Sequence, residues 1–251
     1  MSSRVTIWIA LLWVAAAGTL ALAQASQTDA ELLSAFDSAR FLERPTVGIT
    51  VRVTSATASS SNEAILRLLF KTIDGQERTR IEFLAPADLA GQVYLITPDV
   101  TYFWQPDLAA PLAISSRQSL FGDSAVAQTS GIRFADDYGV ASREAIVLED
   151  GKNVLRVTLS ALRSSVAFPQ AVVTADAVTL EPLSFTLFAL SGAALYDVRI
   201  EEYAAVEGDR YAKTQVITNL LIEGNVTRSE ILVIESGEIP DALFDPAKLG
   251  A

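Results

Sequence analysis

The chain has 251 residues, of which 19 are basic and 30 are acidic, so its formal net charge is −11. Such an acidic chain lacks the basic surface that nucleic acid binding requires, and its hydrophobic content of 50% excludes intrinsic disorder. It has no Cys and no His, which excludes disulfides, thiolate nucleophiles, a Cys lipid anchor, Cys/His zinc sites and acid–base chemistry through imidazole.

The N-terminus has the pattern of a secretory signal peptide. A single charge at Arg4 precedes an apolar run over residues 5–23, and the run ends in small residues. We predict cleavage after Ala23, or after Ala25 in the alternative frame, which makes residues 24–251 a single exported domain. The competing interpretation is an uncleaved anchor, because the run approaches membrane-spanning length.

One helix and one strand are predicted at the start of the exported domain. Thr28 and Glu31 have the spacing of a capping box, and apolar residues follow at helical spacing, which predicts a helix near 29–42. After Pro45 the hydrophobic period changes to two over residues 47–53, which indicates a half-buried strand.

Asp74-Gly75 predicts a two-residue hairpin turn, and this turn determines which residues face each other. Counting outward from Ile73 opposite Gln76, one face of the hairpin is apolar and the other is mostly charged, and we expect the charged face to point to solvent. The apolar-face pairs are Leu66 with Phe83, Leu68 with Ile81 and Phe70 with Thr79; the other pairs are Arg67 with Glu82, Leu69 with Arg80 and Lys71 with Arg78.

Two further turns are treated in the same way. If Asp150-Gly151 is also a two-residue turn, Ile146 faces Leu155 and Glu144 faces Val157, with Ser142 opposite Leu159. A turn at Thr97-Pro98-Asp99-Val100 places Tyr94 beside Phe103 and Val93 beside Trp104.

The remaining β-like runs cover residues 171–174, 184–190, 194–202, 211–223 and 228–235, each bounded by turn-forming residues. The total is ten or eleven strands with few helices and no βαβ alternation. A sheet of this size rarely stays flat, and curling toward a barrel hides its apolar face and reduces its free edges, so the fold class expected is mainly β (α+β) with an antiparallel sheet.

Catalytic patterns are scarce. Asp136 and Asp137 are adjacent and would point to opposite faces of a strand, so a solvated turn is the better interpretation. The Ser residues have no His partner, and no phosphate-binding Gly loop or EF-hand spacing occurs. We therefore expect no enzymatic activity, no cofactor and no metal.

The segment 111–140 lacks strand alternation. Asp123 or Ser124 could cap a short helix through Ser130, with Leu120, Phe121 and Val126 on one side. Such a segment is either a lid over a cavity or a loop held to the core by Phe121, and the residues alone leave both open.

Several segments resemble the outer-membrane lipoprotein-sorting group related to the LolA/LolB carriers. The resemblance rests on residues 83–92, 102–108, 111–115, the Leu-Phe-Gly-Asp block at 120–123 and residues 134–138, and it extends to 190–192, 239–241 and 243–249. It implies a half-open antiparallel β-barrel closed by the N-terminal helix and short lid helices, whose apolar interior holds acyl chains in the periplasm. Because no Cys follows the signal, the chain is similar to the soluble carrier and not to the anchored receptor.

The resemblance also implies partners: an inner-membrane donor, an outer-membrane acceptor, and lipoprotein acyl chains or phospholipid as cargo, carried by a monomer. The cavity Arg that such carriers use has no assigned position here, and its candidates are Arg52, Arg117 and Arg133. The alternative function is a structural or interaction module of the envelope with a filled core and no ligand.

The candidate lipid-binding residues are those on the apolar hairpin faces and in the lid segment. Each has an ordinary alternative as core packing. They are Leu66, Leu68, Phe70, Ile81, Phe83, Tyr94, Phe103, Leu120, Phe121, Val126, Phe134, Ile146, Leu155 and Val157.

Overall fold

The computed structural model describes residues 27–114, 119–121, 124–125 and 132–249. Its main sheet consists of β1 (Thr46–Ala56), β2 (Ser61–Ile73), β3 (Gln76–Ala85), β4 (Val93–Ile96), β5 (Thr101–Trp104), β6 (Leu112–Ile114), β9 (Tyr138–Val147), β10 (Asn153–Ala161), β11 (Gln170–Asp176), β12 (Pro182–Phe188), β13 (Ala194–Val206), β14 (Asp209–Asn219) and β15 (Val226–Glu235). The sheet is antiparallel, and its order is β6-β5-β4-β3-β2-β1-β15-β14-β13-β12-β11-β10-β9.

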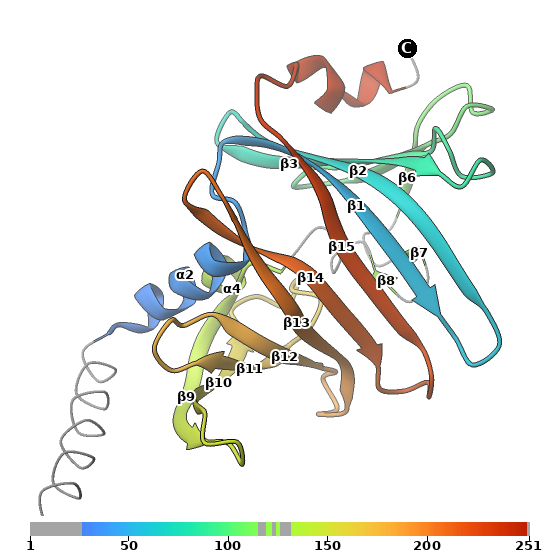
Figure 1. The fold of residues 1–251 in the computed structure, drawn as a ribbon. Coiled ribbons are helices and arrows are strands. Elements are labelled where there is room, and N and C mark those ends of the chain that lie inside the picture. The colour runs from blue at the N-terminus through green and yellow to red at the C-terminus, as the bar shows by residue number, and fades with distance from the viewer. Residues whose placement is uncertain (1–26, 115–118, 122–123, 126–131, 250–251) are drawn as a thin grey trace, which may run out of the picture.

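The sheet is strongly curved, and its two end strands, β6 and β9, do not pair with each other (Figure 1). This confirms the expectation of a mainly β, half-open architecture, although the sheet has 13 strands where ten or eleven were predicted. A second, two-stranded sheet is formed by β7 (Ser119–Phe121) and β8 (Ser124–Ala125). Ser124 and Ala125 lie in β8, so the prediction of a helix capped by Ser124 is wrong. Asp123 and residues 126–130 lie outside the described part of the chain.

The predicted N-terminal helix is present as α2 (Asp29–Arg40), two residues shorter than expected. Its capping box is confirmed: the Thr28 hydroxyl accepts from the Glu31 N–H at 3.2 Å, and the Thr28 N–H donates to the Glu31 carboxylate at 2.8 Å. Leu32, Leu33 and Phe36 are buried against the concave side of the sheet, next to the short helix α4 (Phe134–Asp137). Helix α2 thus lies against β12 and β14 (Figure 1).

The register predicted for the Asp74-Gly75 hairpin is confirmed for every pair. Both turn residues have positive φ, 53° at Asp74 and 75° at Gly75, as a two-residue type I′ turn requires. The turn at residues 97–100 also gives the predicted neighbours, Tyr94 with Phe103 and Val93 with Trp104.

The register predicted for the second hairpin is wrong by one residue. Leu155 pairs with Ala145 and Val157 pairs with Arg143, and Ile146 pairs with Val154. Only Gly151 has a positive φ, 84°, and its N–H donates to the Leu148 carbonyl while Leu148 and Lys152 close the turn. This is a three-residue loop with a glycine bulge, so Ile146 lies on the opposite face of the sheet from Leu155.

The charged face of the first hairpin does not point to solvent as expected. The C-terminal segment, with η1 (Asp241–Phe244) and η2 (Pro246–Lys248), lies on it and buries Ile239, Phe244 and Leu249 against Leu69 and Leu95. Cationic side chains of the hairpin fasten this segment, because Lys71, Arg78 and Arg80 donate to its carbonyl oxygens. The cations are on the predicted face, but that face is covered.

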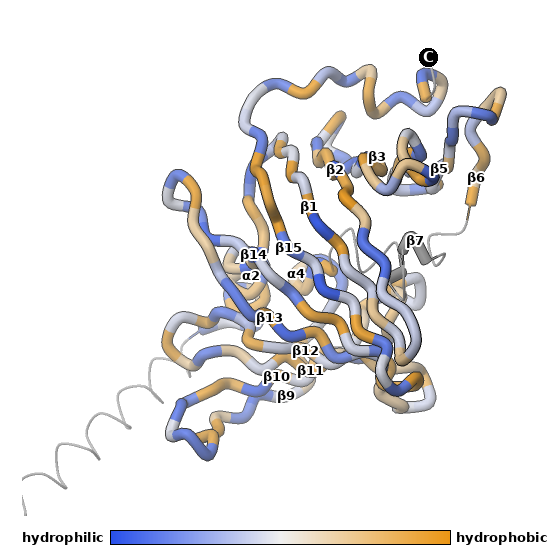
Figure 2. Tube along the Cα trace, turned by 45° about the vertical axis from the view of Figure 1, so that its right-hand side comes forward, coloured by the Kyte–Doolittle hydropathy of each residue, from blue (hydrophilic) through white to orange (hydrophobic). Residues whose placement is uncertain are grey.

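Two hydrophobic clusters occupy the concave face, and they share no residue among those described. The first contains α2 together with Phe134, Phe185 and their neighbours on β10 to β14. The second contains Val51, Leu66, Phe83 and their neighbours on β1 to β5. Figure 2 shows hydrophobic and hydrophilic residues alternating along the strands between the clusters, as expected where one face is buried.

Candidate functional site

A cavity of about 150 Å³ lies on the concave face between the two clusters. One wall is formed by β1, β2 and β15, and the other by β12, β13 and β14, with the α2–β1 connection and residues 132–133 at its edge. Its lining is Arg40, Phe41, Leu42, Arg44, Pro45, Val47, Ile49, Val51, Val53, Leu66, Leu68, Phe70, Lys71, Thr72, Glu77, Ile132, Arg133, Phe185, Leu187, Val198, Tyr211, Ala212, Gln215, Ile217, Ser229 and Ile231.

Three predicted site residues, Leu66, Leu68 and Phe70, line this cavity. The registration of β1 on β2 explains their position, because Leu66 pairs with Val51 and Leu68 with Ile49. Paired residues of an antiparallel ladder share a face, so two apolar rows stand side by side on the cavity wall.

The other predicted residues lie elsewhere. Ile81, Phe83 and Tyr94 are buried in the second cluster, with Phe103 packed against them, and Phe134, Leu155 and Val157 are buried in the first cluster. Ile146 is half-buried on the other face of the sheet. The backbones of Leu120 and Phe121 belong to β7, while their side chains and all of Val126 lie outside the described part of the chain.

Sequence reasoning missed much of the lining, including Ile49, Phe185, Val198 and Ile231. The signal for β1 was available: the alternation over residues 47–53 places Val47, Ile49, Val51 and Val53 on one face, and all four line the cavity. The residues that β12 to β15 contribute to the lining depend on how the sheet curves, and a local sequence pattern does not predict that curvature.

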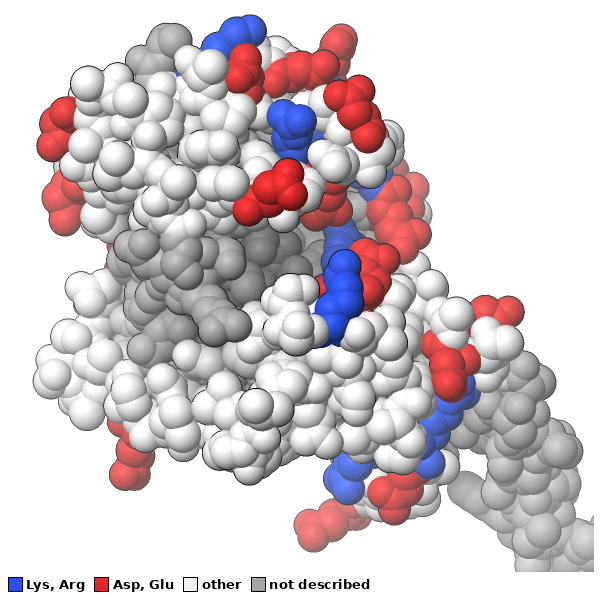
Figure 3. Space-filling model, turned by 180° about the vertical axis from the view of Figure 1, so that it is seen from behind, with Lys and Arg blue, Asp and Glu red and all other residues white. Residues whose placement is uncertain are grey.

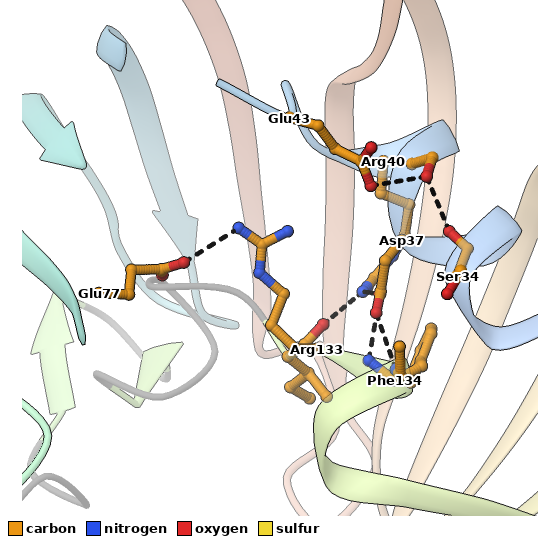
Figure 4. Close-up of polar contacts among 10 residues, drawn as sticks. Ser34, Asp37, Arg40, Glu43, Glu77, Arg133 and Phe134 are labelled. Atoms are coloured by element: carbon orange, nitrogen blue, oxygen red, sulfur yellow. Dashed lines mark hydrogen bonds and ion pairs between the residues drawn. The ribbon is translucent and has the colours of Figure 1, made fainter. Parts of the chain in front are cut away.

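Arg40 is a buried cation in the cavity wall, and only 4% of its surface is exposed. Its guanidinium donates to Asp37 Oδ1 at 2.8 Å and to the Ile132 carbonyl (Figure 4). It also lies 4.2 Å from the Phe134 ring centroid and 5.1 Å from that of Phe185. Burial lowers the pKa of Arg40, and the Asp37 carboxylate opposes that shift.

Of the three arginines proposed for the cavity from the resemblance, Arg133 lies in its lining. Arg133 reaches toward Glu77, which stands on the β2–β3 hairpin across the cavity (Figure 4). Arg52 alternates with Val51 and Val53 and so faces the other side of the sheet, where it pairs with Glu63 and Glu230. Arg117 lies outside the described residues.

No cluster of three His, Cys, Asp or Glu residues suited to a metal ion occurs in the described part of the chain. Within the same residues, no helix has both the length and the apolarity needed to cross a membrane. Seen from behind, the described surface carries basic side chains next to acidic ones along one flank, with few charges over the lower part (Figure 3).

A family model described as uncharacterized protein matches residues 75–251. No curated protein matches the chain significantly.

Three solved structures share the fold. A LolA superfamily protein from Nitrosomonas europaea has a TM-score of 0.77 at 19% identity, over 88% of this chain and 98% of its own. A protein from Vibrio parahaemolyticus described as an outer membrane lipoprotein-sorting domain has a TM-score of 0.75 at 18% identity, over 89% and 98%. A DUF1329 family protein from Desulfovibrio piger has a TM-score of 0.74 at 16% identity, over 86% and 95%. The resemblance found in the sequence is thereby confirmed for the fold.

Proposed function

The chain belongs to the uncharacterized family whose model matches residues 75–251, it has the fold of the LolA superfamily, and we propose that it is a carrier of lipid acyl chains. The observation that carries the proposal is the cavity between the two core clusters, whose walls include aliphatic side chains of β1, β2, β13 and β15. The carrier performs no chemistry on its cargo.

The energetics of lipid transfer require such a cavity. Each methylene moved from apolar surroundings into water costs about 0.8 kcal/mol, so a chain of about 16 carbons costs on the order of 12 kcal/mol. An acyl chain therefore does not cross an aqueous compartment at a useful rate without cover. Val51, Leu68 and Ile231 offer that cover.

The proposed place of action is the periplasm, and two observations support it. Residues 1–23 have the pattern of a cleavable signal peptide, which leaves 24–251 as the mature single domain. One structural neighbour is described as an outer membrane lipoprotein-sorting domain. We extend the proposal to shuttling: as a monomer, the chain takes lipoprotein acyl chains or phospholipid from an inner-membrane donor to an outer-membrane acceptor.

A matched pair of variants tests the carrier function. Ile231 lines the cavity and pairs with Val51, whereas Val233 on the same strand pairs with Thr50 and is 52% exposed on the outer face. Ile231→Trp should lower the affinity for a fluorescent acyl probe at least about tenfold by filling the cavity, which corresponds to about 1.4 kcal/mol. Val233→Trp should leave the affinity unchanged.

Mass spectrometry of solvent extracts from natively purified protein gives an independent test. Co-purified lipid in the parent protein, and less of it in Ile231→Trp, supports the carrier. If neither probe nor lipid binds the folded parent protein, the chain is an envelope structural or interaction module with a packed core.

A further inference from the structure

Arg133 lies at the boundary between the cavity and solvent, with 29% of its side chain exposed. Its guanidinium carbon is 4.1 Å from the centroid of the Phe41 ring. Within the described part of the chain, its one ion pair is a long contact of 3.4 Å to Glu77, whose side chain is 50% exposed. Such an exposed pair is weak, so the cation is available to another anion (Figure 4).

A second guanidinium lies behind Arg133. The Arg40 guanidinium carbon is 4.6 Å from the same Phe41 ring, and the two arginines are close enough for their charges to interact. Arg40 Nε is buried and has no hydrogen-bond partner, although the other side of the group is held by Asp37 and Ile132. An unpaired N–H of a buried cation is a donor that an acceptor entering the cavity would satisfy.

The remaining charges of the lining do not compete for this role. Arg44 is held by Glu207 at 2.9 Å and Asp209 at 3.0 Å, and Lys71 is held by Asp241 at 2.6 Å. Among the described residues of the lining, Glu77 is the one acidic side chain. Arg133 is therefore the lining cation whose carboxylate partner is held least closely, at 3.4 Å.

We propose that Arg133, with Arg40 behind it, binds the anionic headgroup of the lipid whose acyl chain enters the cavity. The chemical class is a phosphate or carboxylate, because a guanidinium donates two parallel hydrogen bonds to either. The headgroup displaces Glu77 from Arg133, and the chain extends past Phe41 toward Ile49 and Leu68. This inference rests on the proposed carrier function and narrows its cargo.

Two lipids with the same acyl chain separate headgroup from chain: palmitoyl lysophosphatidate, which is anionic, and monopalmitoylglycerol, which is neutral. Calorimetry should show that Arg133→Gln weakens lysophosphatidate binding at least about tenfold, as expected for loss of a charge-assisted hydrogen bond, without changing monopalmitoylglycerol binding. Glu77→Gln should strengthen lysophosphatidate binding, because Arg133 is then unpaired. Arg52→Gln, on the outer face with two glutamate partners, is the matched control and should change neither.

Several outcomes would overturn the inference. If Arg133→Gln weakens the binding of both lipids equally, Arg133 maintains the shape of the cavity and does not bind the headgroup. If inorganic phosphate binds the parent protein as tightly as lysophosphatidate does, the ligand of Arg133 and Arg40 is a free anion and not a lipid headgroup. Binding of both lipids with equal affinity to every variant refutes headgroup recognition but keeps the carrier, whereas binding of neither lipid to the parent protein refutes the carrier itself.

Discussion

Phe134 donates its backbone N–H to Asp37 Oδ1 at 3.1 Å, although 97 residues separate them. The Ala135 N–H donates to Asp37 Oδ2 at 2.8 Å, and the Arg40 guanidinium is paired with Oδ1 at 2.8 Å. One buried carboxylate therefore joins α2, α4 and the cavity cation (Figure 4).

Removing that carboxylate should be costly. Asp37→Ala leaves Arg40 buried without its counterion, and we expect a loss of about 3–5 kcal/mol in the free energy of unfolding, measured by urea denaturation. Glu63→Ala, which removes a partner of the exposed Arg52, is the control and should change it by less than about 1 kcal/mol. An Asp37→Ala protein as stable as the control variant would show that the buried pair contributes little.

Alkaline pH should destabilise the fold through tyrosine. Burial raises the pKa of Tyr138, Tyr203 and Tyr94 above the ordinary value of 10.0. In the fold, the hydroxyls of Tyr138 and Tyr203 donate to carbonyl oxygens at 2.9 Å and 2.6 Å, which a phenolate cannot do. Their contribution to stability is therefore complete below pH 10 and is lost as pH rises above it.

Ultraviolet titration of tyrosine ionisation checks this expectation. Of the six tyrosines, these three should ionise late in the folded protein and together with loss of the far-UV signal. Titration of all six near pH 10 with the fold intact would contradict the assignment.

Acidic pH should lower the stability of the fold by protonating Glu235. Hydrogen bonds from Arg67 at 2.6 to 3.2 Å hold the pKa of this carboxyl below its ordinary value of 4.5. A lowered pKa contributes stability above that ordinary value, and the contribution disappears as pH falls below it. Glu235→Gln should therefore be less stable than the parent protein at pH 7 and nearer to it at pH 3, as followed by thermal melts. A constant difference across this range would show that the pair is not the cause.

Cargo retention should be insensitive to mild changes in pH. Without His, the chain lacks the side chain whose unperturbed pKa lies between pH 5 and 8. The fraction of acyl probe retained after gel filtration should be the same from pH 5.5 to 8, and release should require an acceptor. Steep release within this interval would point to a carboxylate of raised pKa.

The two Asp-Gly hairpins illustrate how far local sequence determines register. At Asp74-Gly75 both residues adopt positive φ, and counting outward predicts every pair. At Asp150-Gly151 the same dipeptide forms the end of a three-residue loop, and a change of one residue in loop length moves every partner. The dipeptide signals a turn, while the flanking strands select its length.

The site could be predicted only in part for a related reason. Leu32, Phe36 and Arg40 are four residues apart, so Arg40 belongs to the apolar face of α2, and this spacing identifies it as a buried cation. The covering of the charged hairpin face by Ile239 and Phe244 depends on contacts more than 140 residues distant, and no periodicity reports those. Local patterns give faces, whereas tertiary packing decides what covers them.

The separation of the two hydrophobic clusters has a mechanical consequence. Close-packed cores resist deformation, but within the described residues the two clusters share no member, and the backbone of β1, β15 and β14 joins the two walls of the cavity. We therefore expect bending of these strands to change the width of the cavity without repacking either cluster. For the proposed carrier, sheet curvature would therefore set the range of acyl-chain thicknesses that the cavity accepts.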